Sequence, residues 1–398
     1  MNINITYCYL MFLVPITAKT TPLLGSSKTL IRLMPKAPTF ADIASKNGFD
    51  CEVYNVTTAD GYILGLFRIP GDKKRPVLLM HGILDSADDY IMRQNSSLAI
   101  TLAREGFDVW AGNNRGNRYS RRHIFLNPDT DAKFWDYSFH EMGFFDLPAI
   151  IDFILSSTET SKLSAVGHSE GTTIFYVLGS TRPEYNSKIS VLASLASVVY
   201  LHHSKGLLPI AMKLALAMNR VIKSMNYHEV FGFNSNLKVV LAKFCGSPVG
   251  YEICNEIAIS SVFGSDPKQL EYDFTRILLW NFPSGTSRRN LMHYAQVGTT
   301  GVFAQFDYGS EKNLEVYGSK NAPVYNLTKV TFNVGLFLGA NDLLSTAEDV
   351  ELLKKKLPHV VEYNVVNYPM WNHIDHIVGK YMPKYLFPKL LKLLRTYS

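Results

Sequence analysis

The stretch LSAVGHSEGTTIFYVLG, residues 163–179, decides the fold and holds the clearest candidate for chemistry. Leu163 to Gly167 is a short apolar run, typical of a buried strand in a parallel sheet, and residues 172–179 form an apolar helix. Between them, the pattern G-x-S-x-G places Ser169 at a sharp turn from strand to helix, where its side chain stands clear. An ordinary hydroxyl in a glycine-rich turn is the alternative, but the flanking strand and helix favour a nucleophile.

Strands and helices alternate on both sides of this turn. The elements expected before it are a β-hairpin, a strand, a helix, a strand and a helix: Cys51–Thr58 with Tyr62–Ile69, Arg75–Gly82, Ala99–Arg104, Phe107–Ala111 and Phe144–Ser156. Those expected after it are two strands and a final helix: Val330–Leu338, Val360–Tyr368 and Pro383–Arg395. This alternation predicts a doubly wound α/β fold with a mostly parallel sheet.

Residues 201–324 interrupt the alternation with a mainly helical segment rich in Met, Tyr and Phe. We therefore expect an α/β core formed by residues 19–200 and 325–398, with residues 201–324 inserted as a cap. Within the cap, GLLPIAMKLALAM (residues 206–218) is too apolar for a fully exposed helix and too short to span a bilayer. Most of these residues are expected to pack against the core.

A serine nucleophile needs backbone donors for the oxyanion that forms when it attacks a carbonyl. The N–H of Glu170, directly after Ser169, is one expected donor. The second is expected from the loop after the earlier strand, where the sequence HGIL places Ile83. An ordinary tight turn at His81 and Gly82 is the alternative explanation of that loop.

The acid and the base should follow the serine in chain order. Asp342 lies just beyond the penultimate strand, where a triad acid belongs, whereas Glu348 and Asp349 fall in the next helix and are interpreted as solvated charges. His373 and His376 compete for the role of base. We favour His373 because it is nearer the end of its strand, and we expect a packing or capping role for His376.

Composition and charge narrow the function classes. The 398 residues are 47% hydrophobic and 19% charged, and the formal net charge of +6 is spread along the chain. No basic block interleaved with aromatic residues is present, so nucleic acid is not an expected partner. No Cys or His lies at ligand spacing from another cysteine, which makes a zinc site the weaker reading of the cysteines.

The N-terminal residues favour the secretory pathway. Residues 1–18 contain a short apolar run, Tyr7 to Ile16, followed by the small residue Ala18, as is typical of a signal peptide and too short for a membrane span. An apolar first strand is the alternative.

The sequons and the cysteines also favour the secretory pathway. Three sequons predict glycosylation in the secretory pathway, at Asn55, Asn95 and Asn326. Cys245 and Cys254 lie nine positions apart, close enough to pair in an oxidising compartment. That pairing would leave Cys51 as a free thiol, buried between strands.

Nine motifs together resemble the acid lipase family, which includes gastric and lysosomal acid lipases and many insect lipases. They run in the family's order from about Val53 to Tyr385: LLMHGILDSADDYI, FDVWAGNNRGNRYSRRH, FWDYSFHEMGFFDLPAIIDFI, AVGHSEGTT, NFPSGTSRRNLMHYAQ, FDYGSEKNLEVYG, YNLTKV, GANDLLSTAEDVELL and NHIDHIVG. The resemblance covers nearly the whole mature chain.

The resemblance implies an α/β-hydrolase fold and a secreted or lysosomal lipase without a cofactor. The family hydrolyses triglycerides and, in some members, cholesteryl esters, so the expected substrate is a lipid at an emulsion, micelle or membrane interface. The family's catalytic and oxyanion positions fall on residues already chosen: Ser169, Asp342, His373, Ile83 and Glu170. A disulfide in the family's cap domain has the spacing of Cys245 and Cys254.

The chain departs from the family pattern at two positions, Glu170 in place of Gln and His376 in place of Phe. Only the backbone N–H at position 170 is needed for an oxyanion. However, an ionised carboxylate about 6 Å from that oxyanion would oppose it by roughly 3 kcal/mol at an effective dielectric of about 20. The Glu170 side chain should therefore turn away, pair with a cation such as Arg115, or be protonated during turnover.

Two other functions stay open at the level of sequence. A lipid-binding protein that has lost catalysis is one, but such loss usually removes Ser, Asp or His, and all three are present. An esterase for small soluble esters is the other, against which the cap argues. The oligomeric state is not determined by these features.

Overall fold

The computed structural model describes residues 37–233, 240 and 243–398, so the expected signal peptide lies outside the described residues. Its centre is an eight-stranded sheet with the order β1-β2-β4-β3-β5-β6-β9-β10. In chain order, β1 to β6, β9 and β10 span Glu52–Thr57, Ile63–Ile69, Asp72–Met80, Phe107–Gly112, Leu163–His168, Ile189–Leu195, Asn333–Leu338 and Val360–Val365.

The strands from β4 to β10 are parallel, and only β2 of the N-terminal hairpin runs in the opposite direction. The hairpin closes where the Thr58 N–H donates to the Tyr62 carbonyl at 2.8 Å. Gly61 occupies this turn with a φ of 96°, a conformation that glycine adopts without strain.

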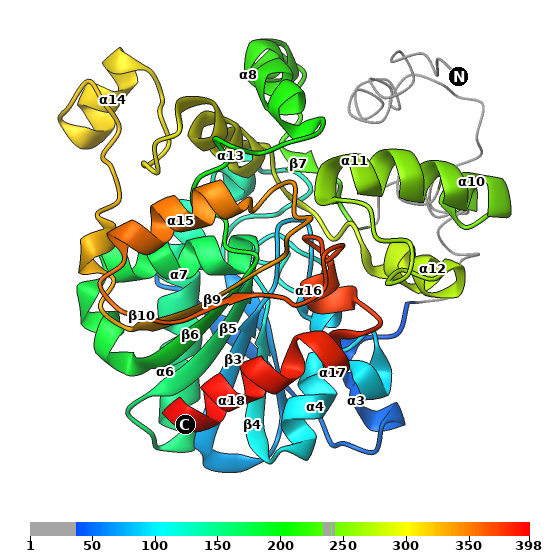
Figure 1. The fold of residues 1–398 in the computed structure, drawn as a ribbon. Coiled ribbons are helices and arrows are strands. Elements are labelled where there is room, and N and C mark those ends of the chain that lie inside the picture. The colour runs from blue at the N-terminus through cyan, green and yellow to red at the C-terminus, as the bar shows by residue number, and fades with distance from the viewer. Residues whose placement is uncertain (1–36, 234–239, 241–242) are drawn as a thin grey trace.

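Helices cover both faces of the sheet, because alternate residues of its buried strands point to opposite sides. On β3, Leu78 and Met80 pack in one apolar cluster, and Val77 and Leu79 in the other. The first cluster includes helices α6, α7 and α15, which span Leu147–Thr158, Glu170–Thr181 and Ala347–Lys356. The second includes α3, α4, α17 and α18, which span Phe40–Lys46, Leu98–Arg104, Met382–Tyr385 and Phe387–Tyr397 (Figure 1).

The predicted α/β fold is confirmed, with differences at the ends of elements. Strand β6 was not identified from the sequence, although its apolar run ISVLASL carries the signal of a buried strand. Strand β9 begins at Asn333 rather than Val330, and β10 ends at Val365 rather than Tyr368. Helix α6 begins later than predicted because a wider, π-helical turn, Met142–Asp146, precedes it.

The segment expected to form the cap lies beyond the carboxyl ends of the parallel strands (Figure 1). Its helices α8, α10, α11, α12, α13 and α14 span Leu208–Ser224, Pro248–Ile253, Ser260–Phe263, Tyr272–Asn281, Arg288–Thr300 and Ser310–Tyr317. A π-helical turn, Cys254–Ile259, joins α10 to α11, and the short strands β7 and β8, Glu229–Val230 and Thr286–Ser287, pair with each other. Among the described residues, none of the helices combines the length and apolar character needed to cross a membrane.

The cysteines pair as expected from the sequence. Cys245 and Cys254 form a disulfide with their Cα atoms 5.7 Å apart. Cys51 is free, but it precedes β1 and is only partly buried, so the expectation of burial between strands is wrong. Desolvation of its thiol raises the pKa of Cys51 to about 11.

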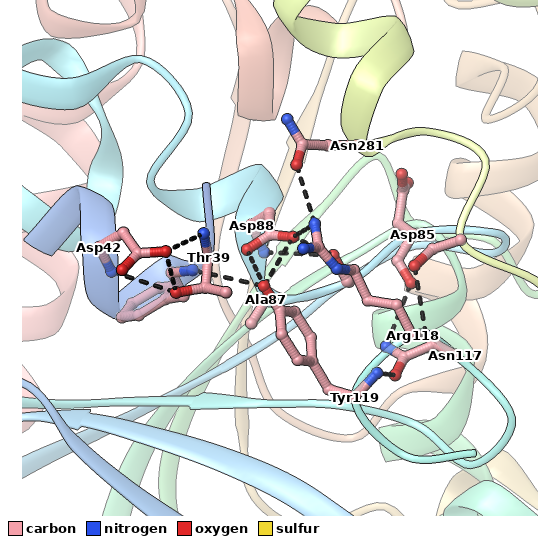
Figure 2. Close-up of polar contacts among 12 residues, drawn as sticks. Thr39, Asp42, Asp85, Ala87, Asp88, Asn117, Arg118, Tyr119 and Asn281 are labelled. Atoms are coloured by element: carbon pink, nitrogen blue, oxygen red, sulfur yellow. Dashed lines mark hydrogen bonds and ion pairs between the residues drawn. The ribbon is translucent and has the colours of Figure 1, made fainter. Parts of the chain in front are cut away.

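Two arginines fasten helix α12 to the core. The Arg93 guanidinium lies 3.5 Å from the centre of the Phe274 ring and forms an ion pair with Glu271 at 2.7 Å. Arg118 donates to Asp88 at 2.7 Å and to the Asn281 side chain at 2.9 Å, as Figure 2 shows. These charged and polar contacts therefore hold helix α12 against the core.

A buried cation also anchors the loop after β4. The Arg115 guanidinium forms ion pairs with Asp146 and Asp60, both at 2.6 Å, and lies 3.9 Å from the centre of the Tyr62 ring. Arg115 and Asp146 are both fully buried, so removing one charge leaves the other poorly compensated.

We expect Asp146→Ala to lower the free energy of unfolding by about 3 kcal/mol, because the buried guanidinium of Arg115 then keeps only the partly exposed Asp60 as a counter-ion. Urea unfolding of the two proteins measures this difference. The control is Lys188→Ala, which removes an ion pair with Asp152 at the surface and should cost less than about 1 kcal/mol. Equal losses in the two variants would contradict the buried-pair argument.

Candidate active site

Ser169 lies on a strained corner between β5 and α7, with φ 51° and ψ −117°. The glycines of the G-x-S-x-G pattern are needed because the backbone packs closely here. A Cβ atom on Gly171 would lie 2.0 Å from the Met80 carbonyl oxygen, and one on Gly167 would lie 2.6 Å from the Gly171 carbonyl oxygen. The first turn of α7 therefore rests directly on the end of β3, with Ser169 at the top of the sheet.

Ser169, His373 and Asp342 form one hydrogen-bonded chain. The Ser169 Oγ lies 2.9 Å from His373 Nε2, and His373 Nδ1 lies 2.9 Å from Asp342 Oδ2. All three residues are at most 5% exposed. Because an Asp342 carboxylate can only accept, Nδ1 carries the hydrogen and Nε2 is free to accept the serine proton.

The acid and base come from the loops after β9 and β10. The other oxygen of Asp342 accepts the N–H groups of Leu344 and Ser345, each at 2.8 Å, which fixes the carboxylate plane. The backbone at His373 is held by His168, whose Nε2 donates to the His373 carbonyl at 3.0 Å. This role of His168 was not anticipated from the sequence, although it occupies the variable position of the pattern.

His376 is fully buried and does not reach Ser169. Its ring lies edge-on to Trp371, with the ring centres 5.7 Å apart, and burial lowers the pKa of His376 to about 4. Of the two competing histidines, the structure brings His373 to the serine and leaves His376 in the packing behind it.

The two acidic residues in the first turn of helix α15 differ from each other. Glu348 is exposed and pairs with Lys205, as the sequence analysis expected for a solvated charge. For Asp349 that interpretation is wrong, because its side chain is 4% exposed and lies 2.7 Å from His203 Nδ1. Asp349 faces the start of the cap segment, which helical spacing alone did not reveal.

Two backbone N–H groups are positioned near the serine. Glu170 is the first residue of α7, so its N–H has no partner within the helix. Ile83 lies in a turn closed by a bond from the Asp85 N–H to the Gly82 carbonyl at 3.4 Å. Within the described part of the chain, neither N–H donates a hydrogen bond to another group.

The loop that carries Ile83 is held by a buried histidine. His81 Nδ1 donates to the Gly82 carbonyl at 2.8 Å, and its Nε2 accepts from the Asn114 N–H at 3.1 Å. Asn117 donates to the Asp85 carbonyl at 3.3 Å. Asn114 and Asn117 were missed as supporting residues, and their signal is the polar run GNNRGNR that stops β4.

The Glu170 side chain is 2% exposed and points into the protein. Its Oε1 accepts from Asn290 Nδ2 on α13 at 2.6 Å, and a further hydrogen bond joins it to Tyr294. The suggestion of Arg115 as its counter-ion is wrong, because Arg115 pairs with Asp60 and Asp146. Burial raises the pKa of Glu170 to about 7.

The sequon asparagines are all at the surface. Each side-chain carbonyl accepts a hydrogen bond, for Asn55 from Arg122, for Asn95 from Arg104 and for Asn326 from Thr328. Glycosylation at these positions stays a prediction. Among the residues that the structure describes, no group of His, Cys, Asp and Glu is arranged to hold a metal ion.

Comparison with known families gives two matches, which lie between residues 40 and 223. A family described as a partial alpha/beta-hydrolase lipase region matches residues 40–94. A family described as the alpha/beta hydrolase fold matches residues 75–223. Together they span the loop that carries Ile83 and the Ser169 corner.

Individual relatives match along most of the chain. "Lipase 1" of Drosophila melanogaster is 36% identical, over 88% of this chain and 78% of its own length. "Gastric triacylglycerol lipase" of Bos taurus is 35% identical, over 87% of this chain and 88% of its own length. Among solved structures, a thermophilic esterase from Thermogutta terrifontis aligns with a TM-score of 0.52 at 13% identity, covering 87% of this chain and all of the esterase, and shows the fold alone.

Proposed function

The chain belongs to the family of gastric triacylglycerol lipase, and we propose that it is a serine lipase acting on neutral lipids. The substrates would be triacylglycerols, with cholesteryl esters as a second possible class. The observation that carries the proposal is the chain of hydrogen bonds from Ser169 through His373 to Asp342. An inactive lipid-binding protein would not need this arrangement, which supports catalysis.

In the proposed mechanism, Ser169 Oγ attacks the ester carbonyl carbon while His373 Nε2 takes the hydroxyl proton. Asp342 keeps His373 in the required tautomer and stabilises the imidazolium. The N–H groups of Ile83 and Glu170 bind the oxyanion of the tetrahedral intermediate. His373 then gives its proton to the leaving alcohol, and an acyl-enzyme remains.

Water completes the cycle. His373 removes a proton from a water molecule, whose oxygen attacks the acyl-enzyme carbonyl and forms a second tetrahedral intermediate. Collapse of this intermediate breaks the bond to Ser169 Oγ, which takes back the proton from His373 and releases the fatty acid. The chain's own residues supply each proton transfer, consistent with hydrolysis without a cofactor.

The disulfide and the proposed substrate class support an assignment of the compartment in which the protein acts. The Cys245–Cys254 bond fits an oxidising compartment. We propose a secreted or lysosomal protein that meets its substrate at an emulsion, micelle or membrane interface. Residues 201–324 would serve as the cap that shields the site and contacts the lipid.

We expect Ser169→Ala and His373→Ala each to lower kcat by on the order of 10³-fold or more, with folding intact. The reason is loss of the nucleophile or of its base. Hydrolysis of emulsified triglyceride and circular dichroism measure the two properties. His376→Ala should retain far more activity than His373→Ala, and the reverse order would overturn the assignment of the base.

The buried Glu170 carboxyl links activity to pH. Its raised pKa means that the side chain is neutral in acid and ionises as the pH rises through about 7. The ionised form lies next to the proposed oxyanion donor and opposes negative charge there. Glutamine can accept the same bond from Asn290 without this charge.

We therefore expect Glu170→Gln to raise kcat/KM at pH 7 and above but to leave it nearly unchanged at pH 4.5. The ratio of variant to wild-type kcat/KM, measured across this range on a soluble ester, tests the effect of the charge. A ratio that stays flat with pH would show that Glu170 has no influence on catalysis.

Helix α8 offers the apolar surface that a lipid interface requires. Met212 is buried beneath it against Gly298 of α13, whereas Ile210 is 54% exposed. Most of residues 206–218 are partly buried, as expected from the sequence, so the helix divides its apolar residues between the core and the outside.

We expect Ile210→Gln to impair hydrolysis of emulsified long-chain triglyceride several-fold more than hydrolysis of a soluble short-chain ester. The substitution removes apolar area at the interface without touching the triad. The control is Leu352→Gln on α15, a helical leucine that is 40% exposed. Equal losses on both substrates would remove the case for interfacial contact through α8.

A further inference from the structure

Two aspartates beside the oxyanion loop have no cationic partner. Asp85 ends the turn that carries Ile83, and Asp89 follows one helical turn later. Their carboxyl groups lie close enough to each other for a hydrogen bond when one of them is protonated. Among the described residues, no Lys, Arg or His forms an ion pair with either, and no N–H or hydroxyl donates to them. Two carboxylates in contact repel strongly, so the contact requires a proton between them.

The neighbouring Asp88 shows what an ionised carboxylate looks like in this region. Its oxygens accept from Arg118 at 2.7 Å, from Tyr119 at 2.8 Å and from Ser86 at 3.0 Å (Figure 2). Asp88 is therefore fully compensated. The contrast with Asp89, which is only 2% exposed and whose Oδ2 accepts no hydrogen bond from the described residues, singles out the Asp85–Asp89 pair.

The pair lies against the catalytic residues. A Cβ atom on Gly82 would lie 3.1 Å from Asp85 Oδ2, 3.1 Å from His168 Nδ1 and 3.4 Å from Ser169 Cβ. His168 donates through Nε2 to the His373 carbonyl, so its Nδ1 is an acceptor, and that atom has no partner. Two acceptors, Asp85 Oδ2 and His168 Nδ1, thus lie beside Gly82, and among the described residues the only hydrogen available to them is a carboxyl proton.

We propose that Asp85 and Asp89 share one proton and act as positioning residues for the Ile83 turn and His373. This proposal rests on the proposed lipase function. With the proton shared, the pair carries a single negative charge. This charge faces His373 and stabilises its imidazolium form. When the proton is lost, two adjacent carboxylates push the turn apart and add charge beside the oxyanion.

Other charged and titratable groups face the pair. Asp88, which is paired with Arg118, and Glu170 on α7 disfavour ionisation of Asp85. His373 favours ionisation of Asp85. His168, His81 and Tyr90 also surround it, and burial lowers the pKa of both histidines and raises that of Tyr90. Burial raises the pKa of Asp85 to about 7 and raises that of Asp89 as well.

The sign of the stability effect follows from these shifts. The folded pair keeps both carboxyl protons up to about pH 7, where Asp85 ionises, and keeps the shared proton at higher pH still, whereas both groups ionise near pH 4 in the unfolded chain. Between these values the folded state binds more protons than the unfolded state. The pair therefore contributes most to stability in acid, and this contribution declines as the pH rises through about 7.

The experiment replaces the shared proton with a permanent donor. Asp89→Asn and, separately, Asp85→Asn each keep one negative charge and supply an amide hydrogen to the remaining carboxylate. Both are made in the Glu170→Gln background, so that Glu170 cannot contribute to the pH profile. The control is Asp108→Asn, a buried aspartate at the opposite end of β4 that is paired with Arg68 at 2.9 Å.

Two measurements are made, kcat/KM for a soluble ester from pH 4 to 9 and the thermal unfolding midpoint of Ser169→Ala proteins over the same range. We expect both Asn variants to stay within about threefold of the background in acid. The pH at which their kcat/KM declines on the alkaline side should rise by at least about one unit. Asp108→Asn should lower the unfolding midpoint without moving that decline.

The unfolding midpoint should also fall less steeply between pH 4 and 7 in the Asn variants. If the alkaline decline of kcat/KM shifts in neither Asn variant, the positioning role of Asp85 and Asp89 is overturned. A midpoint with an unchanged pH slope overturns the shared proton. If no variant hydrolyses any ester, the proposed function fails, while the unfolding measurement still decides whether the proton is shared.

Discussion

The close approach of helix α7 to the end of strand β3 is the constraint on which the rest of the site depends. Gly171 rests against the Met80 carbonyl with no room for a Cβ atom, which forces Ser169 into its strained conformation. The same approach brings the first turn of α7, which begins at Glu170, next to His81 and Gly82. Nucleophile and candidate oxyanion donors are therefore positioned by one packing contact, at the carboxyl edge of a parallel sheet.

The region around this contact is acidic, although the chain as a whole is basic. Asp85, Asp89 and Glu170 are carboxyls without a cationic partner, while Asp88 and Asp146 are neutralised by buried arginines. Each further negative charge among these groups opposes the developing oxyanion, so their protonation favours the proposed reaction. The arrangement therefore ties the chemistry to pH through the surroundings of the nucleophile, beyond the triad itself.

The local sequence determined much of this protein. Short apolar runs with a glycine pattern specify a strand, a corner and a helix, because backbone conformation there depends on near neighbours. The order of Ser169, Asp342 and His373 along the chain follows from where parallel strands end. The spacing of Cys245 and Cys254 was sufficient to predict their disulfide, since both belong to one short stretch.

Only the tertiary structure decided which distant groups meet. His373 and His376 lie three residues apart, and the fold alone places one against Ser169 and the other against Trp371. Asp349 is buried where His203 contacts it, and Glu170 accepts a hydrogen bond from Asn290, 120 positions away, rather than from Arg115. Such pairings depend on long-range packing, which also sets the burial of each charge. Residue type and spacing determine the local turns, whereas the partners of buried charges are determined by the fold.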